Sequence, residues 1–156
     1  MRLFQDLNID IQQNIKEIDY YGYTKIENFL TSEGKSHLLN LINQKYDEIN
    51  SNGKMKYKGV PARNANDKIV YSIYNINHCF IEVLTSSVIR EIAMYKLNDE
   101  YYRFLPNNVP NYILSYYNAR SSGNKLDLHI DSIIPFPGSQ KTNAIQVAIL
   151  LEESTI

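Results

Sequence analysis

Apolar residues in the first two thirds of the chain recur every three or four positions, which is typical of helices. After Thr31 and Ser32, both suitable N-cap residues, this period predicts a helix over residues 33–50. Its apolar face would be formed by Leu38, Leu39, Ile42, Tyr46 and Ile49. A second helical region is predicted over residues 77–84 and 87–97. Its buried stripe would be formed by Val88, Ile89, Ile92 and Tyr95.

Runs rich in Ile, Tyr, Val and Leu predict strands, most of them in the last third of the chain. Short strands are predicted over residues 22–27, entered through a glycine, and over residues 67–74. Three further strands are expected over residues 111–118, 126–131 and 143–151. Helices followed by strands indicate an α+β fold. No internal repeat or Pro/Gly/Ser-rich linker divides the chain, so residues 1–156 are interpreted as a single domain.

Composition and charge argue against several classes of protein. A net charge of -1 without a dense Lys/Arg stripe gives no reason to expect nucleic acid or an anionic membrane as partner. The longest apolar stretch, residues 144–151, is too short to span a bilayer, and the N-terminus lacks the apolar region of a signal peptide. The single cysteine, Cys79, cannot form an intrachain disulfide. We therefore expect a soluble, cytoplasmic protein.

One pair of residues carries candidate chemistry. His129 and Asp131 are one residue apart in a predicted strand, so their side chains would point to the same face. An imidazole and a carboxylate are two of the three ligands of a 2-His-1-carboxylate triad, which leaves positions on Fe(II) open. With 3 His and 17 acidic residues in the chain, an accidental pair at this spacing is roughly a one-in-three event. Taken alone, the pair is better explained as a surface His–Asp pair at a strand end.

Three separated segments add context to this pair. Residues 22–31 (GYTKIENFLT), 113–120 (ILSYYNAR) and 145–153 (IQVAILLEE) flank it in the order and spacing seen in the phytanoyl-CoA dioxygenase family. The chain resembles that family over most of residues 20–154. The resemblance implies an Fe(II)/2-oxoglutarate-dependent dioxygenase that hydroxylates a small organic substrate. It also implies N-terminal helices packed on a double-stranded β-helix of the jelly-roll or cupin-like type.

The resemblance also implies roles for individual residues. His129 and Asp131 would be iron ligands and catalytic residues. The residues that would contact the 2-oxoglutarate or wall its cavity are Asn118, Tyr116, Leu114, Gln146 and Ala148. The residue types leave other interpretations open, because a tyrosine in a strand is as readily a core residue and an asparagine at a strand end often forms a turn.

The chain departs from the family pattern after Asp131. In the family, a second His and an Arg that pairs with 2-oxoglutarate lie downstream of the acidic ligand, whereas residues 132–156 contain neither. His37 and His78 lie upstream in predicted helices and are interpreted as partly buried or capping residues. The β-helix would therefore be incomplete and truncated at the C-terminus. We expect the 156-residue chain to have little or no activity by itself.

Other functions are compatible with the same residues. A prolyl-hydroxylase-like oxygenase would keep the His129–Asp131 pair and act on a protein or peptide. A non-catalytic β-barrel would bind a ligand or a partner and would have lost its iron site. If the pair is accidental, only a soluble α+β domain remains.

Overall fold

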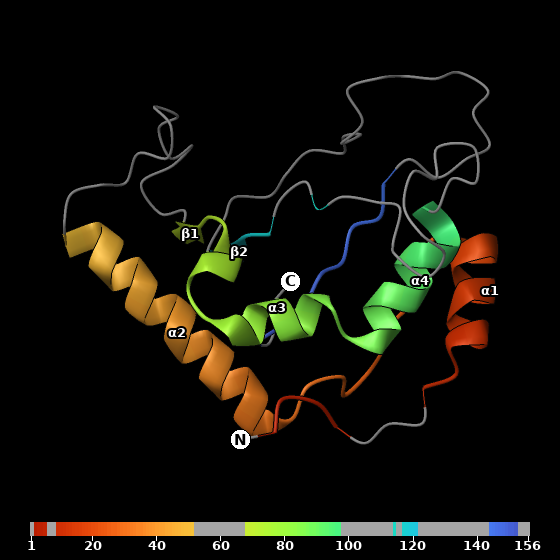
Figure 1. The fold of residues 1–156 in the computed structure, drawn as a ribbon, viewed down its shortest axis with the longest axis horizontal. Coiled ribbons are helices and arrows are strands. Elements are labelled where there is room, and N and C mark those ends of the chain that lie inside the picture. Colours follow the sequence, from red (N-terminus) through yellow and green to blue (C-terminus); the bar gives the residue numbers. More distant parts are fainter. Residues whose placement is uncertain are drawn as a thin grey trace.

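A computed structural model describes residues 2–5, 9–51, 68–97, 114, 117–121 and 144–152. The elements in these residues are α1 (Ile11–Tyr21), α2 (Ser32–Ser51), β1 (Lys68–Val70), the 3₁₀ helix η1 (Ile73–Asn75), α3 (His78–Leu84), α4 (Ser87–Leu97) and β2 (Ala119–Ser121). Figure 1 shows α2 at one end of the molecule, α1 and α4 at the other, and α3 between them. None of the helices described is both long and apolar enough to cross a membrane.

The helices predicted from the apolar period are present as α2, α3 and α4. Thr31 is the N-cap of α2, because its Oγ1 accepts a hydrogen bond from the Gly34 N–H at 2.8 Å. The same hydroxyl donates to the backbone carbonyl of Arg2 at 2.6 Å, which ties the N-terminal segment to the start of the helix. Asn77 caps α3 through its Oδ1, which accepts from the Cys79 N–H at 3.0 Å.

The buried face of α4 differs from the prediction at Tyr95, and Ile89 is only half-buried. Val88 and Ile92 are buried, but Tyr95 is exposed. The Tyr95 hydroxyl donates to Asp19 Oδ2 of α1 at 3.4 Å, and Lys96 Nζ lies 5.9 Å from the tyrosine ring centroid. The ring therefore lies at the edge of the contact between α1 and α4, where its hydroxyl can reach a carboxylate.

The segment before α2 contains a helix that was not predicted, and the strand predicted over residues 22–27 is wrong. Asp10 caps α1, since its Oδ1 accepts from the Gln13 N–H at 3.0 Å. Gly22 ends the helix with a φ of 81°, and its N–H donates to the Ile18 carbonyl at 3.0 Å. The left-handed conformation at Gly22 closes a helix and does not open a strand. Residues 23–26 have no strand pairing.

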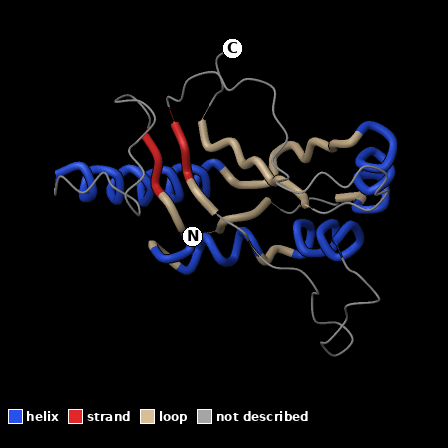
Figure 2. Tube along the Cα trace, turned by 90° about the horizontal axis from the view of Figure 1, so that it is seen from above, coloured by secondary structure: helices blue, strands red, loops and turns tan. Residues whose placement is uncertain are grey.

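The described sheet consists of two short antiparallel strands. Lys68 lies opposite Ser121, and Val70 lies opposite Ala119. Figure 2 shows β1 and β2 side by side, next to α2. The strand predicted over residues 67–74 is thus limited to β1, because Ser72 adopts a φ of 54° and η1 follows directly.

The strands predicted nearer the C-terminus are only partly described. Of residues 111–118, the described ones lie outside a strand, and pairing begins at Ala119. Residues 144–152 are also described without strand pairing, while their predicted neighbour, residues 126–131, lies outside the described residues. A strand requires a hydrogen-bonded partner, so the double-stranded β-helix stays a prediction.

Two hydrophobic clusters hold the described residues together. The larger one buries Leu3, Leu30, Leu38, Val70, Ile73, Cys79, Phe80 and Val83, which come from the N-terminal segment, the α1–α2 connection, α2, β1, η1 and α3. The smaller one buries Ile15 of α1 against Val88 and Ile92 of α4. Phe29 packs against both clusters, so it connects the α1–α4 pair to the rest of the core.

Candidate functional site

Two of the predicted site residues are the proposed iron ligands, and the others are predicted cofactor contacts. His129 and Asp131 lie outside the described residues, as does Tyr116. Their roles stay predictions. The other predicted cofactor contacts are described, and all of them are exposed: Leu114, Asn118, Gln146 and Ala148.

Asn118 has a structural partner. Its Oδ1 accepts a hydrogen bond from the Ser72 N–H at 3.0 Å, next to the hydrogen bond at 2.9 Å from the Ile73 N–H to the Tyr117 carbonyl. These two bonds join residues 72–73 to residues 117–118, so they extend the contact between the two chain segments beyond the β1–β2 pairing. Asn118 thereby stabilises the left-handed backbone at Ser72, and its amide nitrogen is the part of the side chain that this bond does not use.

Side chains alternate along residues 117–120. Tyr117 and Ala119 are half-buried and pack against the larger cluster, whereas Asn118 and Arg120 are exposed. The Tyr117 ring meets the Phe80 ring edge-on, with 6.3 Å between centroids and 79° between planes. Burial, with a smaller contribution from Cys79, raises the pKa of Tyr117 to about 12. This phenol is therefore neutral at physiological pH.

Segments that are far apart in the sequence meet in the larger cluster. In the described part of each of the three segments around the His129–Asp131 pair, two apolar side chains belong to this cluster or pack against it. These side chains are Phe29 and Leu30, Tyr117 and Ala119, and Ile149 and Leu151. The C-terminal pair belongs to the segment coloured blue in Figure 1. One core is thus shared by all three segments.

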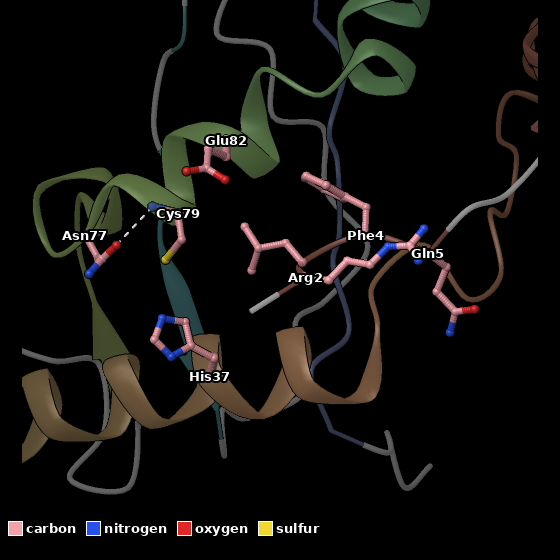
Figure 3. A pocket seen from close by; sticks show the side chains of 8 residues that line it. Arg2, Phe4, Gln5, His37, Asn77, Cys79 and Glu82 are labelled. Carbon is pink, nitrogen blue, oxygen red and sulfur yellow. Dashed lines mark hydrogen bonds between the residues drawn. The ribbon is translucent and has the colours of Figure 1, made fainter.

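A hollow of about 400 Å³ lies between the N-terminal segment, α2 and α3. Figure 3 shows the Cys79 sulfur and the His37 ring pointing toward one another across it, with Glu82 one helical turn further along α3. Burial raises the pKa of the Cys79 thiol, and the Glu82 charge adds to this effect. Because the thiolate is the reactive form, Cys79 is a poor nucleophile at neutral pH.

The two upstream histidines lie on different helices. His37 is half-buried on α2, and His78 is exposed at the first position of α3. The His78 Nε2 lies 3.8 Å from Glu82 Oε1, one turn away on the same helix. Within the described residues, no three His, Cys, Asp or Glu side chains are grouped closely enough to hold a metal ion.

Sequence reasoning singled out Tyr116 and did not single out Tyr117. Both are tyrosines in an apolar run, and the sequence alone does not show which of them packs against the core; Tyr117 does, and Tyr116 lies outside the described residues. Comparison with known proteins adds no further assignment, since no family model, no curated protein and no solved structure matches the chain.

Proposed function

We propose that this protein is an Fe(II)/2-oxoglutarate-dependent dioxygenase that hydroxylates a small organic substrate. The observation that supports it best is that the three segments of the family resemblance pack against one hydrophobic cluster. A cytoplasmic location is part of the proposal, because Cys79 is a buried free thiol, which suits a reducing compartment.

The donor atoms of the proposed ligands suit the metal. His129 would supply a nitrogen and Asp131 an oxygen, and this combination is typical of non-haem Fe(II) oxygenases. Bound iron and 2-oxoglutarate would supply the activation of dioxygen. Asn118 would donate a hydrogen bond from its amide Nδ2 to a cofactor carboxylate, since its Oδ1 already accepts one from the Ser72 N–H. Residues 132–156 contain no His, so the proposal assigns only two protein ligands.

An anaerobic titration tests the proposal. The protein, expressed from its complete coding sequence, is titrated with Fe(II) in the presence of 2-oxoglutarate, and the visible charge-transfer band of the ternary complex is recorded. We expect a band that saturates at one iron per protein and is lost in His129→Ala and in Asp131→Ala.

His78→Ala is the matched control, because this exposed histidine of α3 is not a proposed ligand. The band should persist in that variant. If the unaltered protein gives no band at saturating iron and 2-oxoglutarate, the enzyme proposal fails and a non-catalytic binding module is favoured. A band that survives both ligand substitutions would place any iron elsewhere in the protein.

A further inference from the structure

Three exposed tyrosines gather where α1 ends. The exposed fractions of Tyr20, Tyr21 and Tyr23 are 82%, 64% and 70%. The Tyr20 and Tyr21 rings are 4.7 Å apart between centroids, with 84° between planes. The Tyr21 and Tyr23 rings are 6.4 Å apart, with 47° between planes. Aromatic rings that cluster on the surface are informative, because single exposed apolar groups are common and grouped ones mark binding sites.

Tyr21 and Tyr23 stand at the rim of a hollow. Gly22 lies between them with a φ of 81°, so the chain reverses there and both rings come to line one depression of about 320 Å³. Its lining consists of Glu17, Tyr21, Tyr23, Thr24, Lys25 and Glu27. The hollow therefore combines aromatic side chains with carboxylates.

The Glu17 carboxylate is held in place by neighbouring side chains. Its Oε1 accepts from Gln13 Nε2 at 3.3 Å, and its Oε2 accepts from the Thr24 hydroxyl at 2.5 Å. The Thr24 oxygen in turn accepts from Asn14 Nδ2 at 2.8 Å. These bonds use part of the accepting capacity of the carboxylate and fix its orientation before any ligand arrives.

The charges that line the hollow leave it negative. Lys25 Nζ lies 2.7 Å from Glu27 Oε1, and this hydrogen bond raises the pKa of Lys25 and lowers that of Glu27. Both groups are therefore ionised at neutral pH and offset one another. The formal charge that remains is the single negative charge of Glu17.

We propose that this hollow binds an alkylated ammonium cation of the trimethylammonium type. Such a cation is attracted to the faces of aromatic rings, and it is recognised in proteins by tyrosine and tryptophan side chains. Tyr21 and Tyr23 provide the ring faces, and Glu17 provides the opposite charge. A small hydrated cation would gain little from the rings. None of the residues involved belongs to the proposed iron site, so each proposal can be refuted without affecting the other.

Two probes of the same shape, one charged and one neutral, test whether binding depends on the positive charge of the ligand. Choline and its neutral analogue 3,3-dimethylbutan-1-ol are titrated into the metal-free protein at constant ionic strength, and binding is followed by saturation-transfer NMR of the methyl protons. We expect saturable binding of choline and weaker binding of the alcohol. Equal binding of the two probes, or no saturable binding of choline, overturns the proposal.

Variants test the location of the site. Tyr21→Leu and Tyr23→Leu should each weaken choline binding about two- to fivefold, as expected for an exposed cation–aromatic contact. Glu17→Gln should weaken it by a similar factor, and Tyr23→Phe should retain it because the ring remains. Tyr74→Leu, on η1, is the control and should bind as the unaltered protein does.

Circular dichroism confirms that each variant is folded before binding is measured. If choline binding is unchanged in the two leucine variants and in Glu17→Gln, the cation binds elsewhere and the proposal is overturned. A trimethyllysine peptide forms the second arm of the experiment. Tighter binding of this peptide than of choline would identify a methylated side chain as the source of the cation, and equal or weaker binding would favour a free small molecule.

Discussion

Replacing Gly34 by alanine should destabilise the protein, although alanine is the better helix former by about 1 kcal/mol. Gly34 lies in the first turn of α2, where the N-terminal segment crosses the helix. A Cβ added there would lie 2.6 Å from the Leu3 carbonyl oxygen and 3.0 Å from the Leu3 Cα. Because both are backbone atoms, no rotation of a side chain relieves the overlap.

The size of the destabilisation by Gly34→Ala depends on how far the N-terminal backbone has to move. The 2.6 Å contact is 0.8 Å shorter than the 3.4 Å at which ordinary contact begins, so residues 2–5 must shift away from α2. That shift weakens the hydrogen bonds from the Thr31 N–H to the Leu3 carbonyl, at 2.9 Å, and from the Thr31 hydroxyl to the Arg2 carbonyl. Each contributes about 0.5–1.5 kcal/mol. With the strain of overpacking, we expect a net loss of about 1–3 kcal/mol.

Urea unfolding of Gly34→Ala and Ser36→Ala measures the difference. Ser36 is exposed on the same helix, so its replacement should raise the free energy of unfolding by a few tenths of a kcal/mol, about the difference in helix propensity. If Gly34→Ala proves as stable as Ser36→Ala, the backbone of residue 3 does not lie against α2, and the reasoning is refuted.

Two further predictions concern the larger cluster. Phe80→Ala should lower the free energy of unfolding by about 3–5 kcal/mol, because its side chain is 1% exposed. Ile81→Ala, at the neighbouring position with 38% exposure, should cost less than half as much in the same urea experiment. The pKa of Tyr117, raised from 10.0 to about 12, predicts that stability is full below pH 10 and falls as the pH rises toward 12, since the unfolded chain loses its phenolic proton first. Tyr117→Phe should flatten this alkaline decline, and an unchanged decline would exclude Tyr117 as its cause.

The helices were predictable because their signals are local. The cap at Thr31 directly precedes α2, the apolar residues of α2 recur three or four positions apart, and an α-helix closes its hydrogen bonds over four residues. α1 carried the same signals, with Asp10 before it and Gly22 after it. Gly22 was instead interpreted as the entrance to a strand, because a glycine before an alternating run permits either interpretation until its φ is known.

Strands were harder to predict, because pairing depends on residues far away in the sequence. The boundary of β2 at Ala119 is set by its register with β1, about 50 residues earlier, and nothing local to residues 111–118 specifies that register. The exposure of Asn118 follows from the same pairing. The chemistry of the His129–Asp131 pair could be inferred from its spacing, whereas its geometry depends on neighbours that spacing does not reveal.

The position of Phe29 between the two hydrophobic clusters has a consequence for local unfolding of the protein. α1 is held to α4 by the small cluster of Ile15, Val88 and Ile92 and by side-chain hydrogen bonds to Asp19. Among the described residues, Phe29 is an apolar side chain that packs against both this cluster and the larger one. A small cooperative unit such as the α1–α4 pair unfolds locally at a lower free energy than the main core does. Amide protons of α1 and α4 should therefore exchange with solvent before those of α2 and α3. Among the described helices, the aromatic rim at Tyr21 would thus belong to the pair that unfolds locally at the lower free energy.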